Sequence, residues 1–330
     1  MHTVHSKPPE PAARRASIEH LPVNLFGSVM GLAGLSLAWR LAASAFGAST
    51  LVAALIGALA CAVFAVLVLA HLLKWLRHPE TVAAEFRHPV IGNFYGTITI
   101  STLLVASVIG SYSALLQQVI WTIGTILTLI LSFASVSRLL KGNVDADHAV
   151  PAWLIPGVAT LDIAVSGGSL PMPWAQEVNL FATSAGAVIA IVLFTMIFSR
   201  LVHKAPLAKG MLPSMMILIG PFEVGFLAYV NVYHSVDAFA GLLFYFGLFL
   251  FIVITCIMLR SSPTFAPGWW VISFPMAALA NAALKYDLAR AVLPLHYLAG
   301  AILMLVTLTI AVLLLRTLYL LANGTLLQGA

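Results

Sequence analysis

Five long stretches of this chain contain no aspartate, glutamate, lysine or arginine, and this feature constrains the fold more than any other. A helix of about 20 apolar residues is long enough to cross the hydrocarbon core of a bilayer, and each stretch reaches that length. In lipid the backbone groups must be paired within the segment, so such a stretch folds as an α-helix. The stretches are Leu51–Leu73, Leu115–Ser137, Val178–Ser199, Ala238–Leu259 and Val292–Leu315.

Between them lie five segments that are also apolar but that contain proline, glycine or polar residues. The two kinds alternate along the chain, which predicts ten transmembrane helices. A soluble fold is excluded, because 61% of the residues are hydrophobic and only 8% are charged, against about 25% charged in a soluble domain. The sequence therefore predicts an all-α integral membrane protein. The five less apolar segments are Pro22–Trp39, Val90–Gly110, Pro151–Leu170, Leu212–Val232 and Pro267–Leu284.

Lysine and arginine are enriched in the cytoplasmic loops of membrane proteins, so their distribution orients the predicted helices. If the N-terminus is cytoplasmic, all but three of the 16 Lys and Arg residues fall on the cytoplasmic side. The exceptions are Arg40, Lys285 and Arg290. We therefore expect both ends of the chain in the cytoplasm, with a disordered tail at 1–20, one membrane domain at 21–320 and a second tail at 321–330. The net charge of +5 reflects this topology and does not indicate nucleic-acid binding.

The less apolar segments share a plan that indicates a repeat. Each begins at a proline or directly beside one, and the steps between these prolines are 67, 62, 62 and 54 residues. A period of this kind indicates repeated units, here five helical hairpins. Further prolines or glycines interrupt these segments, among them Gly27, Gly31, Gly96, Pro156, Pro221 and Pro275.

An internal proline removes a helix hydrogen bond and bends the helix. Irregular backbone at membrane depth is tolerated where it is buried in protein or lines a cavity. We therefore expect the odd helices to be bent and to line a pore, and the even helices to form a straight outer ring. The alternative is that glycine and proline are simply common in membrane helices, where small residues help close packing.

Two acidic residues, Asp162 and Glu223, lie near the middle of odd helices. A charge in the membrane is costly, so an intramembrane carboxyl group is a candidate functional group. Three interpretations remain open at this stage. Both groups are protonated because burial disfavours the charged form, or they form hydrogen bonds at a kink, or they carry protons in a coupled transporter.

Other polar residues are candidates for the lining of a pore. Asn93, Thr97 and Ser101 are four residues apart and share one face of a helix. Their amide and hydroxyl groups suit a weakly selective conduit, although hydrogen bonding between helices explains them equally well. Lys285 and Arg290 would attract anions at the outer mouth, or they would anchor the helix at the lipid interface.

Two stretches of the sequence resemble a known family. Leu21–Arg40 (LPVNLFGSVMGLAGLSLAWR) and Trp269–Tyr286 (WWVISFPMAALANAALKY) are similar to the first and ninth helices of the tellurite-resistance/dicarboxylate transporter family, which includes bacterial TehA proteins and plant guard-cell slow anion channels. The resemblance extends from about Pro22 to Arg316. It implies a bacterial inner-membrane homotrimer in which five hairpins surround a pore in each protomer. A phenylalanine of the ninth helix plugs that pore, and by motif position it is Phe274.

Residues and resemblance together predict a channel that conducts small anions across the lipid bilayer, with Phe274 as its gate and Asn281 as a polar lining residue one or two turns further on. The alternative is a proton-coupled transporter of small dicarboxylates or oxyanions that uses Asp162 or Glu223. The sequence shows no metal-binding spacing, phosphate loop or nucleophile motif. We therefore expect no metal, no cofactor and no enzymatic activity.

Overall fold

The structure is a computed structural model of the chain, and it describes residues 17–142, 145–261 and 265–326. This part of the chain consists of α-helices, short 3-10 helices and their connections, and it contains no strand. The α-helices are α1 (Phe26–Phe46), α2 (Thr50–Arg77), α3 (Pro79–Arg87), α4 (Gly96–Ile109), α5 (Ala114–Leu140), α6 (Ile155–Gly167), α7 (Pro173–His203), α8 (Gly220–Tyr233), α9 (Ala238–Ser261), α10 (Ser273–Arg290) and α11 (Leu293–Ala322). The 3-10 helices are η1 (Ile18–His20), η2 (Val23–Leu25), η3 (Ile91–Tyr95), η4 (Ala146–His148), η5 (Pro151–Leu154), η6 (Lys209–Ile219) and η7 (Pro267–Ile272).

Eight helical stretches in the described ranges are long and apolar enough to cross a membrane, which confirms the prediction of an all-α membrane fold. They include α2, α5, α7, α9 and α11, which correspond to the five uncharged stretches of the sequence. They also include α1, α4 and α8, each together with the 3-10 helix that precedes it. The predicted spans at Pro151–Leu170 and Pro267–Leu284 are helical as well, but the first is shorter than these eight and the second is less apolar.

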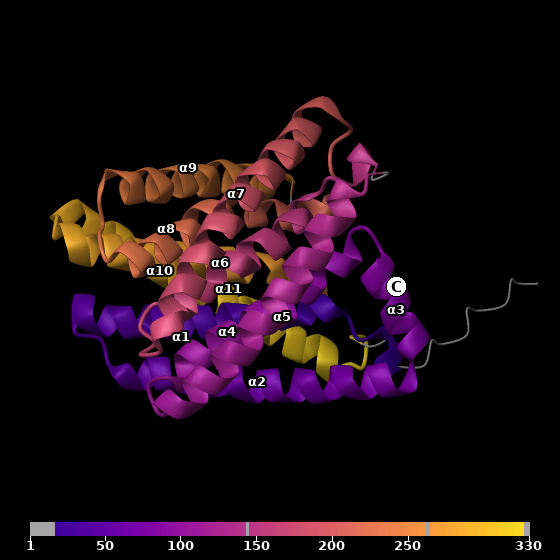
Figure 1. The fold of residues 1–330 in the computed structure, drawn as a ribbon, viewed down its shortest axis with the longest axis horizontal. Helices are drawn as coiled ribbons and strands as arrows, with labels where there is room; N and C mark the ends of the chain where they lie inside the picture. Colours follow the sequence, from indigo (N-terminus) through magenta and orange to yellow (C-terminus); the bar gives the residue numbers. More distant parts are fainter. Residues whose placement is uncertain (1–16, 143–144, 262–264, 327–330) are drawn as a thin grey trace, which may run out of the picture.

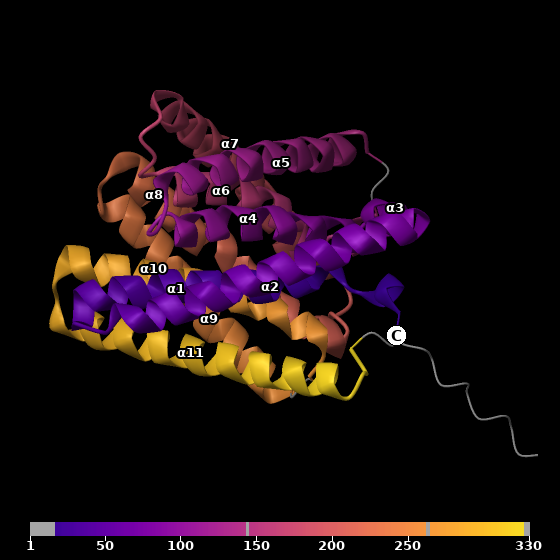
Figure 2. The same ribbon diagram turned by 90° about the horizontal axis from the view of Figure 1, so that it is seen from below.

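The helices form an exposed set and a buried set. In α2, α5, α7, α9 and α11, between 22% and 33% of the residues in the most apolar part of each helix are buried. The corresponding share is 56–72% in the segments that contain α1, α4 and α8. In the drawings α2 and α9 lie at opposite edges of Figure 1, and α7 and α11 lie at opposite edges of Figure 2, with α1, α6 and α10 between them. The exposed set therefore surrounds the buried set.

Every buried helix begins as a 3-10 helix and continues as an α-helix. The pairs are η2 with α1, η3 with α4, η5 with α6, η6 with α8, and η7 with α10. Pro156 and Pro221 lie in the first turn of their α-helices, Pro275 is the third residue of α10, and Gly96 is the first residue of α4. Proline at the start of a helix removes no internal hydrogen bond. These prolines therefore mark a change of helix type at the start of each α-helix, and the bend expected at these positions stays a prediction.

The helices α1 and α10 pack with their backbones close together. A Cβ atom on Gly27 would lie 3.0 Å from the carbonyl oxygen of Trp270, and one on Gly31 would overlap the side chain of Ser273. The Ser273 hydroxyl donates to the carbonyl oxygen of Gly27 at 2.9 Å. Small residues allow such close approach in membrane proteins. Gly27 and Gly31 thus allow α10 to pack closely against α1. The sequence analysis expected these two glycines to bend the helix.

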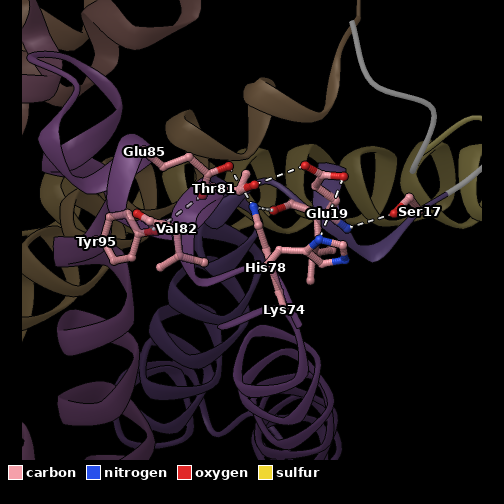
Figure 3. Close-up of polar contacts among 9 residues, drawn as sticks. Ser17, Glu19, Lys74, His78, Thr81, Val82, Glu85 and Tyr95 are labelled. Atoms are coloured by element: carbon pink, nitrogen blue, oxygen red, sulfur yellow. Dashed lines mark hydrogen bonds and ion pairs between the residues drawn. The ribbon is translucent and has the colours of Figure 1, made fainter. Parts of the chain in front are cut away.

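An ion pair with a buried lysine, together with its hydrogen bonds, joins four segments at the end of the molecule where α3 lies (Figure 3). Lys74, in the last turn of α2, is fully buried. Its Nζ lies 2.6 Å from Oε1 of Glu85 on α3 and donates to the carbonyl oxygen of Leu21 at 2.9 Å. The second carboxylate oxygen of Glu85 accepts a hydrogen bond of 3.3 Å from the hydroxyl of Tyr95 in η3. The ion pair therefore fixes the residues from which α1 and α4 begin.

The N-terminal segment is also ordered closer to the chain end than predicted. Residues Ile18–His20 form η1, and Glu19 accepts a hydrogen bond of 3.0 Å from the hydroxyl of Thr81 (Figure 3). The imidazole of His78 lies 3.9 Å from the same carboxylate. The tail predicted to be disordered through residue 20 is thus too long, and residues 1–16 lie outside the described ranges. At the other end, α11 continues to Ala322, into the predicted tail 321–330.

Candidate functional site

A cavity of about 400 Å³ lies among the buried helices, and α1, α4, α6, α8 and α10 all contribute to its lining. We call it the polar cavity, because Arg40, Asp162, Asn231 and Lys285 lie in its wall. These residues belong to the second halves of their helices, which all start from 3-10 helices that pack against one another. The polar cavity is therefore displaced toward the opposite side of the molecule.

A second, much smaller cavity of about 30 Å³ lies nearer the 3-10 helices, and residues from all five buried segments also line it. Of the residues that the structure describes, Phe274 alone lines both cavities. Its side chain is only 6% exposed. A space of about 30 Å³ holds one or two water molecules at most.

Lys285 presents a positive charge to the polar cavity. Its Nζ donates to Oδ1 of Asn231 at 2.6 Å. The amide nitrogen of Asn231 donates in turn to the carbonyl oxygens of Ala164 and Val165 at 3.2 and 2.7 Å. These bonds to α6 fix the orientation of the Asn231 amide, so its oxygen points at the ammonium group. Lys285 has no carboxylate partner among the described residues.

The structure separates the other residues predicted at this end of α10. Asn281 lines the polar cavity, but its amide nitrogen already donates to the carbonyl oxygens of Gly34 and Ala277, both at 2.8 Å. Arg290 is exposed, does not line the cavity, and holds its guanidinium carbon 5.5 Å from the centre of the Tyr286 ring. Of the two predicted outer cations, Lys285 alone therefore faces the cavity.

Asp162 lies in the wall of the polar cavity and is 1% exposed. Neither carboxyl oxygen has a hydrogen-bond partner within the described part of the chain. A buried ionised carboxylate without a partner would cost several kcal/mol. The geometry therefore favours the neutral form of this side chain.

Glu223 does not belong to the same site. Its side chain is fully buried and points to α9, where a Cβ atom on Gly247 would overlap the carboxyl group. It lines neither the polar nor the small cavity. The two acidic residues that the sequence analysis grouped as coupling candidates thus lie in different environments.

The predicted stripe of Asn93, Thr97 and Ser101 does not face one lumen. Asn93 lies in η3 and donates to the carbonyl oxygen of Pro89 at 2.8 Å, whereas Thr97 and Ser101 lie in α4. Thr97 lines the small cavity, and Ser101 donates to the carbonyl oxygen of Phe26 at 3.1 Å. A 3-10 helix has 3.0 residues per turn against 3.6 in an α-helix, so residues four apart across this junction do not share a face. The hydrogen bond of Ser101 to Phe26 joins α4 to the start of α1.

Sequence reasoning missed Asn231, which orients Lys285, and it used Arg40 only to infer topology. The signal was available in part, because Asn231 is a polar residue near the end of an apolar segment. The sequence does not show that Asn231 lies next to Lys285, because the two residues are 54 positions apart in the chain.

Comparisons with known proteins bear on what this arrangement does. Residues 20–318 match the sequence model of the family described as voltage-dependent anion channel. Over 269 residues the chain is 30% identical to a protein of Haemophilus influenzae named tellurite resistance protein TehA homolog, and the alignment covers 81% of each chain.

Two further relatives are more distant. The chain is 25% identical over 250 residues to an uncharacterized transporter of Methanocaldococcus jannaschii, covering 68% of this chain and 73% of the relative. It is 25% identical over 309 residues to the guard cell S-type anion channel SLAC1 of Arabidopsis thaliana, covering 90% of this chain and 55% of that channel.

Proposed function

The chain belongs to the voltage-dependent anion channel family, and from this membership we propose that it conducts small anions along the axis of its five buried helices. The observation that carries the proposal is the position of Phe274, which alone among the described residues lines both cavities. An aromatic side chain at a narrow apolar point blocks ions by filling the space and by excluding water. Phe274 is thus the proposed gate.

This pathway requires that all ten predicted helices, including α6 and α10, lie in the membrane as five hairpins. The buried set would then line the path, the exposed set would face lipid, and both chain ends would be cytoplasmic. A trimer with one path per protomer is part of the same proposal and follows from the family resemblance.

The charges of the polar cavity support anions as the permeant species. Lys285 and Arg40 contribute two positive charges to its wall, and the geometry around Asp162 favours a neutral carboxyl group. A cavity lined by one sign of charge raises the local concentration of the opposite ion. The polar cavity would therefore concentrate anions next to Phe274.

One observation favours a second candidate, a proton-coupled carrier of small dicarboxylates or oxyanions. Asp162 is an unpartnered carboxyl group in the wall of a cavity, and such a group can exchange a proton with a passing substrate. Glu223 lines neither the polar cavity nor the small cavity, so a carrier of this kind would use Asp162.

Recordings from the purified protein in planar bilayers distinguish the two candidates. With unequal anion concentrations and equal pH on the two sides, we expect a current whose reversal potential follows the anion gradient. A pH difference imposed without an anion gradient should give no current. Uptake that saturates with substrate and requires a proton gradient would instead establish the carrier.

Replacing Asp162 with asparagine should leave the reversal potentials unchanged and change the current by less than about twofold, because asparagine resembles the neutral carboxyl group in size and charge. The measurement is the bilayer current of Asp162→Asn at two pH values. Glu223→Gln is the matched control, since it makes the same change at a buried site outside the cavities. Proton-driven uptake that Asp162→Asn abolishes and Glu223→Gln retains would contradict the channel.

Removing the charge of Lys285 should reduce the conductance by about two- to fivefold at low salt, because fewer anions would then occupy the polar cavity. The effect should shrink at about 1 M salt, where the Debye length falls to about 3 Å. Single-channel recording of Lys285→Gln at both salt concentrations measures it. Arg290→Gln removes an exposed charge that does not line the cavity and serves as control. Equal losses in the two variants would assign the effect to surface charge in general.

A further inference from the structure

A separate cavity of about 400 Å³ lies outside the proposed pathway, between α5 and α7. We call it the lateral cavity. Residues of two exposed helices line it, Val136 and Leu139 on α5 and Ile189 and Leu193 on α7, and Pro156 at the start of α6 lies at its inner wall. Its lining also includes Arg87 of α3, Asn93 of η3 and Trp153 of η5, which lie at the starting ends of the buried helices, whereas the polar cavity lies toward their other ends.

The lateral cavity is cationic at one end and apolar at the other. Arg87 closes α3 and Arg138 lies in the last turn of α5, and both contribute to the lining. The apolar side chains of α7 come from a part of that helix more than two turns before its end. A molecule that fills the cavity would therefore contact guanidinium groups near the membrane surface and aliphatic side chains deeper in the membrane.

Neither arginine is neutralised by a carboxylate in the described part of the chain. Arg138 donates a hydrogen bond of 3.4 Å to the carbonyl oxygen of Phe86, and its guanidinium carbon lies 5.6 Å from the centre of the Phe86 ring. Asp145 also lines the cavity, but its carboxylate accepts a hydrogen bond of 2.9 Å from the backbone of Asp147. Two arginines thus face one cavity, and their guanidinium groups form no ion pair with a carboxylate of the described residues.

We propose that the lateral cavity binds an anionic phospholipid of the leaflet on the α3 side, with the phosphate between Arg87 and Arg138 and an acyl chain between α5 and α7. Guanidinium groups bind phosphate oxygens through paired hydrogen bonds. Basic pockets between transmembrane helices at the cytoplasmic side are typical sites for anionic headgroups. The position of the apolar residues selects a lipid over a free phosphate, which would leave the deeper half of the cavity empty.

This lipid would lie directly behind the proposed pathway. Pro156 and Gly157 line the lateral cavity, while their neighbours Ile155 and Val158 line the small cavity. The start of α6 is thus a wall shared by the two spaces. The lipid site itself does not depend on what passes through the pathway, so it can be tested independently of the proposed function.

Native mass spectrometry of the full chain in detergent measures the affinity for added lipids. We expect phosphatidylglycerol to bind at least about tenfold more tightly than phosphatidylcholine, because only the former carries a net negative charge for the two arginines. Arg87→Gln/Arg138→Gln should remove this preference. The matched control Arg77→Gln/Arg260→Gln removes two exposed arginines at the ends of α2 and α9, and it should bind phosphatidylglycerol within about twofold of the wild type.

A second variant tests the apolar half of the site. Val136→Phe fills the lateral cavity and keeps both arginines, and it should weaken the binding of phosphatidylglycerol by about tenfold. The proposal is overturned if Arg87→Gln/Arg138→Gln binds the lipid as the wild type does, or if Val136→Phe has no effect. Glycerol phosphate that competes as well as the whole lipid would identify a free-phosphate site and would likewise overturn it.

Discussion

Replacing Phe274 with alanine should raise the anion conductance by about tenfold or more. The aromatic ring lies between a cavity of about 400 Å³ and one of about 30 Å³, and its removal would join them. A tenfold change requires the barrier to fall by only about 1.4 kcal/mol, which is small compared with the cost of passing an ion through an apolar constriction. Bilayer recording of Phe274→Ala at equal protein density measures the effect.

Two controls separate an opened gate from a loosened core. Phe226 is fully buried on α8, packs against Phe244 and Tyr286, and lines neither cavity. We expect Phe226→Ala to lower thermal stability without raising the conductance. Phe274→Leu, which keeps a side chain of intermediate size, should give an intermediate current. An unchanged current in Phe274→Ala protein that elutes as a folded species would show that Phe274 is not the gate.

Replacing Glu85 with alanine should destabilise the protein by about 3 kcal/mol, because it leaves the Lys74 ammonium buried without its counter-ion. Removing one partner of a buried ion pair costs about 3–5 kcal/mol, and we take the lower end since the Glu85 side chain is 23% exposed. The hydrogen bond from Lys74 to the Leu21 carbonyl oxygen would remain. The thermal unfolding midpoint in detergent should fall by several degrees.

An exposed ion pair and a double variant serve as controls for this prediction. Lys204 and Asp147 are 3.1 Å apart with side chains 51% and 59% exposed, and such surface pairs contribute about 0–1 kcal/mol. Asp147→Asn should therefore have little effect. Lys74→Met/Glu85→Leu, which replaces both charges by apolar groups, should recover most of the stability. Equal unfolding midpoints for Glu85→Ala and Asp147→Asn would contradict a structural role for the buried pair.

The sequence was a good guide to the membrane helices because lipid imposes a simple rule. A stretch of apolar residues without charges has few alternatives to a spanning helix, and α2, α5, α7, α9 and α11 follow the predicted stretches closely. The proline period marked four of the five starts of the buried segments to within two residues, whereas Pro213 lies four residues inside η6. It did not reveal that each begins as a 3-10 helix, because proline is compatible with the first turn of either helix type.

The candidate site was harder to predict, because its residues meet only through tertiary packing. The resemblance located Phe274 in the motif, and the structure placed it between the cavities. Asp162 and Glu223 looked equivalent in the sequence, since both are acidic residues in odd segments, and only the orientation of their helices separates them. Lys74 was read as one of many topological charges, although it is buried against Glu85.

The polar cavity has a consequence for how a membrane voltage would act on this protein. A cavity that contains water conducts and polarises far better than the packed helices around it, so little of the voltage would fall across it. Most of the voltage would then fall across the packed part of the molecule that begins at Phe274 and includes the small cavity. An anion would meet most of the potential difference after it leaves the polar cavity, and that difference is worth about 2.3 kcal/mol per 100 mV for a single charge.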